Sequence, residues 1–265
     1  MWRPPVASRR RDQGGIIMQA NVQAATYYEH YDKLLAPVYT WMAGGAEAAF
    51  TRGERELADI GLLGSSVKSA VDLGAGFGMH AIPLARSGCR VLAVDTSAFL
   101  LRELAAHAKG LPVLPAQDDL LDFSRHLTGT PEVVLCLGDT LPHLQEYSSV
   151  TTLIASVADC LSQGGRFVIS FRDYSKALAG IDRFIPVKSD NARILTCFLE
   201  YVGDRILVHD ILHELQEGAW TMRASAYRKL RLQPHRVRAQ LEKSGFAVDV
   251  DSGPAGMIRF RATRN

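Results

Sequence analysis

The residue types best suited to chemistry in this chain lie in one short stretch that is rich in glycine. From position 70 to 78 the sequence reads Ala-Val-Asp-Leu-Gly-Ala-Gly-Phe-Gly, so glycines occupy positions 74, 76 and 78. An apolar run that ends in closely spaced glycines predicts a buried parallel strand, a tight turn and then a helix. Because glycine has no Cβ atom, the backbone at Gly74 and Gly76 can lie directly against a bound molecule. We therefore expect this turn to form the floor of a cofactor site.

The spacing of glycines and acids indicates which kind of cofactor would bind. A dinucleotide fingerprint requires glycines at the first, third and sixth positions, so that the following helix can hold a pyrophosphate. The sixth position here is Met79, and an acid, Asp72, precedes the glycines. A second acid, Asp95, ends the next apolar run twenty-one residues after Gly74, where a carboxylate can bind ribose hydroxyls. The pattern favours a nucleoside without a pyrophosphate over a nicotinamide dinucleotide.

These two motifs resemble the first two motifs of class I S-adenosylmethionine-dependent methyltransferases. The residues that carry the resemblance are 71–78 and the run Val-Asp-Thr-Ser at 94–97, and the likeness extends over roughly residues 27–264. It implies an α/β fold of the Rossmann-like type, in which helices cover both faces of a seven-stranded, mostly parallel sheet. It also implies a methyltransferase enzyme with S-adenosyl-L-methionine as the cofactor and S-adenosyl-L-homocysteine as the product.

The resemblance also implies which residues contact the cofactor. Asp119, at the end of a predicted third strand, matches the acid that receives the adenine amino group; Asp118 is the adjacent alternative, and a helix N-cap is the structural interpretation. Tyr31 or Tyr39 would meet the methionine end from an N-terminal helical segment, although such aromatic clusters commonly pack in a core. Arg52 is a candidate for the cofactor carboxylate on position alone. The expected cofactor contacts are Tyr31, Tyr39, Asp72, Gly74, Ala75, Gly76, Phe77, Asp95, Thr96, Asp119, Leu120, Leu137 and Gly138.

Two further segments resemble the acceptor site of glycine N-methyltransferases and related amino-acid or amine N-methyltransferases. Residues 136–144, Cys-Leu-Gly-Asp-Thr-Leu-Pro-His-Leu, resemble that group's Gly-Asn-Ser-x-x-His-Leu pattern, with Asp139 in place of the asparagine. Residues 170–175, Ser-Phe-Arg-Asp-Tyr-Ser, resemble its His-Arg-Asn-Tyr segment, which carries Arg172 over to the arginine that pairs with the substrate carboxylate. The extra negative charge at Asp139 would favour a cationic or amine-bearing substrate, or orient a hydroxyl.

The expected catalytic residues are Asp139, His143 and Arg172. His143 is of the residue type suited to a base near neutral pH; its alternative role is to tether the loop after Pro142, and we favour that structural role. Methyl transfer from a sulfonium is an in-line displacement with a good leaving group, so strong acid–base machinery is not required.

Together these matches predict methylation of a small molecule, with an amine of a carboxylate-bearing metabolite as the favoured acceptor. One alternative is an O- or C-methyltransferase of a larger secondary metabolite, which an apolar cap with Arg172 turned away would favour. A catalytically inert cofactor-binding subunit is a second alternative. A methyltransferase for RNA or protein is a third, and the near-neutral charge of the chain counts against it.

Composition narrows the classes of partner. The chain has 265 residues, 47% of them hydrophobic, and a formal net charge of +2, so it can bury a core but has no strong basic field for a polyanion. Its four cysteines stand singly, without metal-ligand spacing, and are interpreted as reduced core residues. No apolar run reaches the roughly eighteen residues of a membrane span. We expect a small-molecule substrate, no nucleic acid, no metal and no membrane, with the cytoplasm as the default location and a homodimer left open.

The order of predicted elements divides the chain. Residues 1–20 are expected to be a disordered basic tail, with Met18 as an alternative start, and residues 21–265 a methyltransferase domain. Strands alternate with helices up to about residue 171, and after that apolar and polar residues alternate with period two from 194 to 231. This change predicts an inserted antiparallel β cap at about residues 176–232. Its basic residues Arg223, Arg228, Lys229 and Arg231 are interpreted as a solvated strand face.

Helices are expected before and within the alternating part. Residues 21–50 show a helical pattern that Pro37 interrupts, and Gly44-Gly45 is either a hinge or a helix stop. An amphipathic helix is expected at residues 51–63 and the first crossover helix at residues 79–87.

Overall fold

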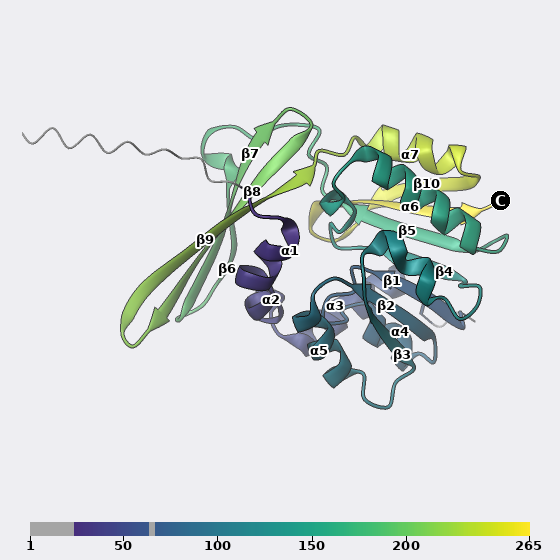
Figure 1. Ribbon diagram of the computed structural model, residues 1–265, viewed down its shortest axis with the longest axis horizontal. Helices are drawn as coiled ribbons and strands as arrows, with labels where there is room; N and C mark the ends of the chain where they lie inside the picture. Colours follow the sequence, from purple (N-terminus) through teal and green to yellow (C-terminus); the bar gives the residue numbers. More distant parts are fainter. Residues whose placement is uncertain (1–23, 64–66) are drawn as a thin grey trace, which may run out of the picture.

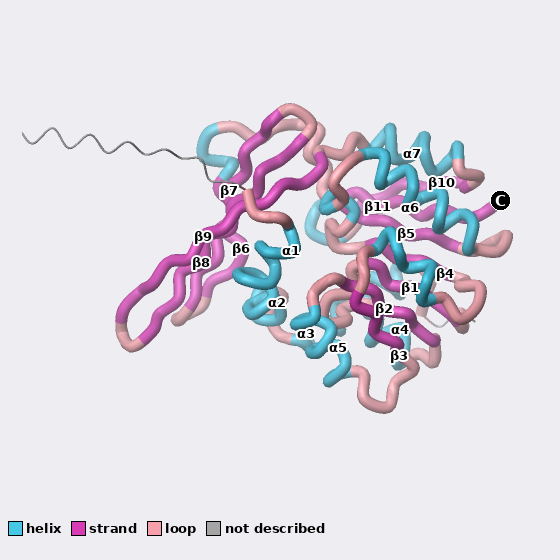
Figure 2. Tube along the Cα trace, in the orientation of Figure 1, coloured by secondary structure: helices cyan, strands magenta, loops and turns pink. Residues whose placement is uncertain are grey.

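The computed structural model describes residues 24–63 and 67–265 (Figure 1). The expectations for residues 1–20 and for Met18 therefore lie outside the described residues. The described chain forms a seven-stranded sheet and a four-stranded sheet, and the helices of residues 27–42 lie between them (Figure 2). The candidate site lies where these helices meet the larger sheet.

The larger sheet has the strand order β10-β11-β5-β4-β1-β2-β3. Its strands are β1 (Ser69–Leu73), β2 (Arg90–Asp95), β3 (Val113–Gln117), β4 (Val133–Cys136), β5 (Arg166–Phe171), β10 (Phe246–Ser252) and β11 (Ile258–Arg264). The strands from β1 to β5 pair in parallel, whereas β11 runs antiparallel to both β5 and β10. The inner strands are almost wholly buried, as expected when helices cover both faces. The predicted fold class is confirmed.

Each face of this sheet has its own apolar cluster and its own helices. One face carries α3 (Ala46–Asp59), α4 (Ala81–Arg86) and α5 (Ala98–His107), and the other carries η2 (Leu120–His126), α6 (Tyr147–Cys160) and α7 (Pro234–Lys243). Successive residues of a strand point to opposite faces, so Ala70 belongs to the first cluster and Val71 to the second. The helix expected from residue 51 begins at Ala46, immediately after Gly45. The helix expected at residues 79–87 is shorter, because residues 76–80 form turns and α4 begins at Ala81.

The N-terminal segment is one continuous helical stretch made of α1 (Tyr27–His30), the π-helix η1 (Tyr31–Leu35) and α2 (Ala36–Met42). Pro37 does not interrupt it, contrary to our expectation. Proline has no backbone N–H, so the carbonyl of Lys33, four residues earlier, lacks its usual helical partner. The Arg223 guanidinium instead donates to that carbonyl at 3.1 Å. Gly44 and Gly45, with φ of +81° and +95°, then separate α2 from α3.

The smaller sheet is the predicted antiparallel one. It consists of β6 (Phe184–Ser189), β7 (Arg193–Val202), β8 (Arg205–Gln216) and β9 (Ala219–Leu230), in that spatial order and after the short η4 (Gly180–Arg183). Its strands extend away from the larger sheet as a long arm (Figure 1). One face packs on the N-terminal helices, where Leu195 and Leu212 contact Leu34, Leu35 and Val38. The division into a domain and an inserted cap stays a prediction.

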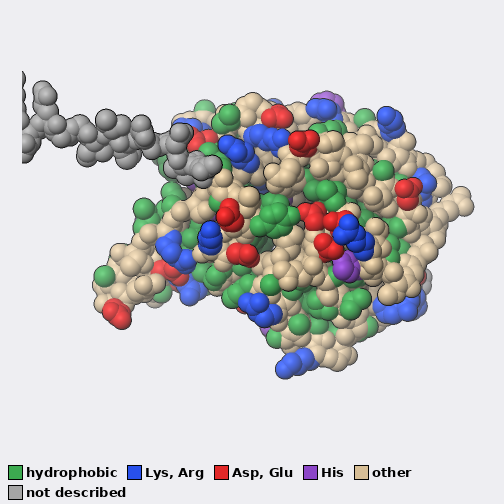
Figure 3. All heavy atoms as spheres, in the orientation of Figure 1, with side chains coloured by type: hydrophobic (Ala, Val, Ile, Leu, Met, Phe, Trp, Pro, Cys, Tyr) green, Lys and Arg blue, Asp and Glu red, His purple; other side chains and the backbone are tan. Residues whose placement is uncertain are grey.

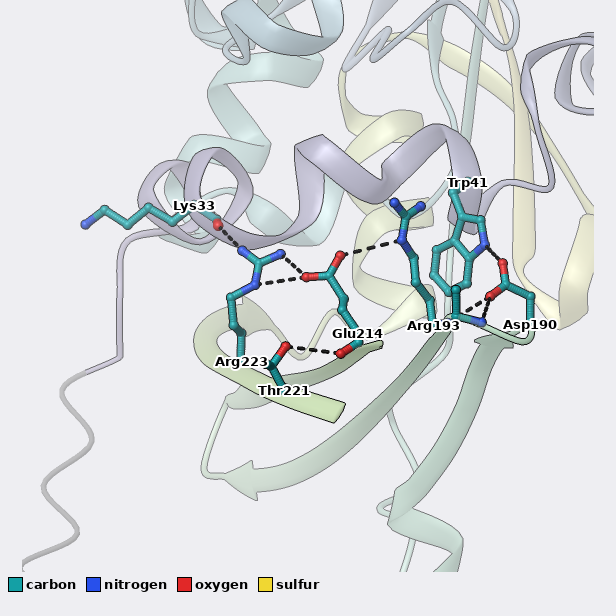
Figure 4. A network of polar contacts seen from close by, with 8 residues as sticks. Lys33, Trp41, Asp190, Arg193, Glu214, Thr221 and Arg223 are labelled. Atoms are coloured by element: carbon teal, nitrogen blue, oxygen red, sulfur yellow. Dashed lines mark hydrogen bonds and ion pairs between the residues drawn. The ribbon is translucent and has the colours of Figure 1, made fainter. Parts of the chain in front are cut away.

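A polar network fastens the N-terminal helices to the smaller sheet (Figure 4). Glu214 accepts from Arg223 at 2.7 Å and lies 3.5 Å from Arg193. The indole of Trp41 donates to the Asp190 carboxylate at 2.5 Å. Because Arg223 also donates to the Lys33 carbonyl in the π-helix, one arginine joins the helix to two strands of the sheet.

The surface charges, the helix lengths and the cysteines bear on what the protein could bind. Basic and acidic side chains are interspersed over the face shown in Figure 3. No helix among the described residues combines the length and apolar character that crossing a bilayer requires. Within residues 24–63 and 67–265, no group of three or more His, Cys, Asp or Glu is arranged to hold a metal ion. The four cysteines are free thiols, of which Cys89 and Cys136 are buried.

Candidate active site

A pocket opens at the carboxyl ends of β1, β2 and β4, beneath the N-terminal helices. It encloses about 660 Å³ of space, part of it open to solvent. Nine of the residues expected from the sequence lie in its lining: Tyr31, Tyr39, Gly74, Gly76, Asp95, Thr96, Leu120, Gly138 and His143. The lining also includes residues that were not expected there: Tyr27, Val94, Leu100, Thr140 and Leu144. Ligands of parallel α/β sheets bind at this edge, so the pocket is where the motifs should meet.

Asp95 ties the glycine turn to the end of β2. One of its carboxylate oxygens accepts from the amide of Gly76 and the other from the amide of Ser97, both at 2.8 Å. Burial raises the pKa of Asp95, and these amide bonds oppose that rise because they favour the charged carboxylate. Each oxygen keeps a further lone pair, so the carboxylate can still accept hydrogen bonds from two ligand hydroxyls.

Gly74 shows why the turn requires glycine. Its φ is +75°, and a Cβ atom at this position would lie 2.4 Å from the Cγ2 atom of Thr140. The hydroxyl of Thr140 donates to the carbonyl of Leu137 at 2.8 Å, which holds the threonine against the turn. Sequence reasoning missed Thr140, although it stands directly after Gly138-Asp139 in the motif that follows β4.

The two adjacent acids after β3 have different surroundings. Asp119 accepts from the Leu121 amide at 2.9 Å and from the Tyr28 hydroxyl at 2.5 Å, so it forms the N-cap of η2. Asp118, the adjacent alternative, lies in the pocket lining and hydrogen-bonds His126 at 2.8 Å. That bond lowers the pKa of Asp118 and keeps it charged. Of the two acids, Asp118 is therefore the one that lines the pocket.

Asp72 lies below the glycine turn rather than in the pocket lining. It is 2% exposed, and its Oδ2 atom has no hydrogen-bond partner among the described residues. Burial raises the pKa of Asp72 to about 6, against the opposing charge of His80. His80 itself pairs with Glu56 of α3 at 3.0 Å. Three other expected contacts, Ala75, Phe77 and Leu137, are likewise buried in the core cluster on the α3 side.

The raised pKa of Asp72 predicts a dependence of stability on pH. The folded protein holds this proton up to about pH 6, whereas the unfolded carboxyl loses it near pH 4, so ionisation of Asp72 makes the fold less stable as pH rises through that interval. Asp72→Asn removes the free-energy cost of ionising this buried carboxyl. A pKa shift of about two units corresponds to a cost of about 3 kcal/mol at most. We expect the substitution to be more favourable for stability at about pH 8 than at about pH 4. Urea unfolding at the two pH values measures this, and an equal effect at both would contradict it.

Asp139 and Lys229 form a buried ion pair that the sequence did not reveal. Their side chains are 2.7 Å apart and 10% and 9% exposed. Asp139 also accepts from the backbone amide of Arg172 at 2.9 Å and from the Tyr174 hydroxyl at 3.3 Å. The interpretation of Lys229 as part of a solvated face was wrong, because this end of β9 packs against the loop after β4. Asp139 is therefore neutralised within the protein and stands outside the pocket lining.

His143 lies in the pocket lining within η3 (Leu141–His143) and is surrounded by tyrosines. Its ring stacks on Tyr227 with centroids 5.4 Å apart and planes 7° apart, and it makes edge contacts with Tyr27 and Tyr31 at 5.6 and 5.5 Å. Burial lowers the pKa of His143 well below its usual value, and the positive charges of Lys229 and His30 lower it further. Its Nδ1 atom has no hydrogen-bond partner among the described residues. The arrangement holds a neutral imidazole at the pocket wall.

Neither candidate arginine lines the pocket. Arg172 is exposed, and its guanidinium donates to the carbonyl of Ala255 in η5 (Pro254–Gly256) at 3.1 Å. Arg52 donates to the carbonyl of Ala43, at the end of α2. The carboxylate-binding roles expected for these residues stay predictions.

Comparisons with known proteins agree with this geometry. Residues 70–165 match the family described as methyltransferase domain. A stretch of 115 residues is 27% identical to a glycine/sarcosine N-methyltransferase of Parasynechococcus marenigrum (strain WH8102); it covers 43% of this chain and about two-fifths, 41%, of that relative. The sugar N-methyltransferase KedS8 of Streptoalloteichus sp. superposes over all of both chains with a TM-score of 0.69 at 16% identity. The amino pentose methyltransferase CalS10 of Micromonospora echinaspora, solved with S-adenosylmethionine bound, superposes over 86% of this chain and 96% of its own with a TM-score of 0.68 at 16% identity.

The fold is that of class I S-adenosylmethionine-dependent methyltransferases. The stretch that matches the methyltransferase domain, residues 70–165, contains the glycine turn, Asp95 and the loop after β4. The resemblance seen in the sequence is confirmed.

Proposed function

We propose that this protein transfers the methyl group of S-adenosyl-L-methionine to a nitrogen atom of a small-molecule acceptor. The observation that carries the proposal is Asp95, which lines the pocket and keeps both carboxylate oxygens available at the tip of β2. This is the geometry needed to bind the two ribose hydroxyls of an adenosyl group. Asp118 lies in the same lining for the adenine amino group, and Tyr31 and Tyr39 lie in it for the remainder of the cofactor.

The charged groups of the pocket lining disfavour an acceptor that carries a carboxylate. Among the described lining residues no lysine or arginine is present, and the charged side chains, Asp95 and Asp118, are the two assigned above to the adenosyl group. A carboxylate of the acceptor would therefore find no cationic partner in this lining, since Arg172 turns toward Ala255. The turning away of Arg172 supports the larger acceptor of the alternative interpretation, although that alternative placed the methyl group on oxygen or carbon rather than on nitrogen. The names of KedS8 and CalS10 point the same way, so an amino sugar is our favoured acceptor class.

The protein's contribution to this reaction is positioning. Bound S-adenosylmethionine supplies an electrophilic methyl group on a positively charged sulfur, whose thioether is a good leaving group. The glycine turn and Asp95 would hold the nucleoside end, which would give the methyl group a defined place relative to the acceptor nitrogen. The aromatic side chains of Tyr27, Tyr31 and His143 form one wall of the pocket and would shield that place from water. A neutral acceptor amine with a free lone pair is all that the displacement then requires.

Two measurements test the proposal. The melting temperature of the full chain should rise with S-adenosylhomocysteine, because a ligand that binds the folded state stabilises it by mass action. Transfer of labelled methyl from S-adenosylmethionine should then be found on at least one member of a panel of amino sugars, simple amines and amino acids. Stabilisation without any transfer would support the inert cofactor-binding alternative, and transfer confined to amino acids would restore the carboxylate-bearing acceptor. The homodimer and the cytoplasmic location expected from the sequence stay predictions.

A further inference from the structure

The two faces of the smaller sheet have different surroundings. Directly opposite residues of adjacent antiparallel strands point to the same side, so the register divides the sheet into an inner face and an outer face. On the inner face Leu195 and Leu212 pack on the N-terminal helices, and Arg193, Glu214 and Arg223 form the network of Figure 4. The outer face is the opposite one, and its large aliphatic and aromatic members include Phe184, Ile194, Ile211, Leu215, Trp220 and Met222.

The outer face is apolar where an antiparallel sheet normally meets water. Such sheets usually direct apolar side chains toward a core and polar side chains toward solvent. Here Met222 is 63% exposed and Trp220 is 50% exposed, and no apolar cluster of the described residues includes either side chain. β8 carries Ile211 and Leu215 on the outer face while it carries Leu212 on the inner one. A contiguous apolar surface of this kind marks an interaction site.

We propose that the outer face is the contact surface of a homodimer, in which the arms of two copies of this chain pack face to face. A two-fold axis brings the same surface of each subunit together, so the apolar centre of one outer face meets that of the other. Antiparallel sheets pack in this way as two layers about 10 Å apart. This surface is separate from the proposed catalytic function, and it gives a defined place to the homodimer that the sequence left open.

The size and charge of the outer face fit a second copy of the chain. Four strands of six to twelve residues make a face of roughly 20 Å by 35 Å, or about 700 Å², and a stable interface uses about 800 Å² on each partner. From the row of Phe184 to the row of Trp220, the register places no Asp, Glu, Lys or Arg on this face. Two identical charge-free centres can meet without repulsion or unpaired charges. The arm projects from the larger sheet, which leaves the face accessible (Figure 1).

Pairing along a strand edge is the competing arrangement. β6 forms one edge, and its Pro186, its Lys188 and the register shift between them discourage pairing with another chain. At the other edge, the bridge from Ala25 to Tyr227 covers the end of β9 that lies nearer the larger sheet. Edge pairing would lengthen the sheet and leave the outer face exposed, so the two arrangements differ in which side chains become protected.

Sedimentation equilibrium of the full chain tests the dimer. We expect twice the mass of one chain from about 1 µM to about 100 µM. Ile194→Glu/Met222→Glu places carboxylates at the centre of the outer face, where the partner would bury them, so the dissociation constant should rise at least about 100-fold. Both side chains are exposed in the single subunit, so the variant should keep its fold. Leu114→Glu changes an equally exposed leucine on β3 of the larger sheet and should leave the dimer intact.

Hydroxyl-radical footprinting of the wild type tests the surface without any substitution. Trp220 and Met222 should be labelled less than Trp41 and Met42, although Trp41 and Met42 are the less exposed pair in a single subunit. The reverse order in a dimer would mean contact through another surface or along an edge, and would overturn the inference. A monomer at every concentration would also overturn it, as would a folded double variant that dimerises as tightly as the wild type. Neither measurement uses the cofactor, so a failure to bind S-adenosylhomocysteine would count against the proposed function alone.

Discussion

Replacing Asp95 by alanine should abolish the stabilisation that S-adenosylhomocysteine gives to the protein. The carboxylate is the group in the pocket that is placed to accept two ribose hydroxyls, and hydrogen bonds to a charged group contribute about 1.5–3 kcal/mol each. The expected loss of affinity is therefore at least about 100-fold. The substitution also leaves the buried amides of Gly76 and Ser97 without their acceptor, so the unliganded protein should melt several degrees lower. Isothermal titration calorimetry and thermal melting measure the two effects separately.

Two matched variants make this result interpretable. Asp95→Asn keeps an acceptor oxygen at the tip of β2 but loses the charge, so its affinity should fall between those of the wild type and the alanine variant. Asp122→Ala removes an acid that forms a surface ion pair with Arg125, and it should leave binding unchanged. Full retention of affinity by Asp95→Ala would mean that the adenosyl group binds elsewhere in the molecule.

Replacing Gly53 by alanine should destabilise the protein, although alanine is the better helix former. Gly53 lies within α3, where alanine normally gains about 1 kcal/mol over glycine. Here an added Cβ atom would lie 2.0 Å from the carbonyl oxygen of Met79, which is backbone and cannot turn away. Helix α3 would have to move off the glycine turn, at a cost near the upper end of overpacking effects, about 3 kcal/mol. Urea unfolding of the two proteins measures the difference.

Gly129→Ala is the matched control for this change. A Cβ atom at Gly129 would meet no atom within 4 Å, so the same chemical substitution should be neutral or stabilising by about 0.5 kcal/mol. An unchanged free energy of unfolding in Gly53→Ala would show that α3 and the glycine turn can separate without loss. Because the turn carries the pocket floor, a fall in cofactor affinity should accompany the fall in stability.

The sequence predicted the parts of this protein that follow from local patterns. The strand, turn and acid around Gly74 and Asp95 were predictable from residue types. A buried strand requires a run of apolar residues, and a crowded turn with positive φ requires glycine. Asp119 shows the limit of that reasoning: spacing located the end of β3 but could not decide which of two adjacent acids turns into the pocket. Arg172 shows the same limit. The motif located its backbone at the end of β5 but did not reveal that its side chain contacts Ala255.

The features that were missed depend on contacts between distant parts of the chain. Lys229 looked like a solvated strand residue, since its partner Asp139 is 90 residues away and the alternation of a strand does not reveal what lies opposite it. Pro37 looked like a helix breaker because its local effect is to leave a carbonyl without a donor. The donor comes from Arg223 on β9, and such a tertiary contact cannot be inferred from the residues around the proline.

The ion pair between Lys229 and Asp139 also limits how this protein can be recombined with its relatives. One member belongs to the arm-like sheet and the other to the loop after β4, so a chimera that exchanges only the arm would separate them. The exchanged arm would bring whatever residue its donor has at that position, and an unmatched carboxylate would remain buried in the host. Grafting experiments that aim to change acceptor preference should therefore transfer the arm together with residues 138–140, as one unit of design.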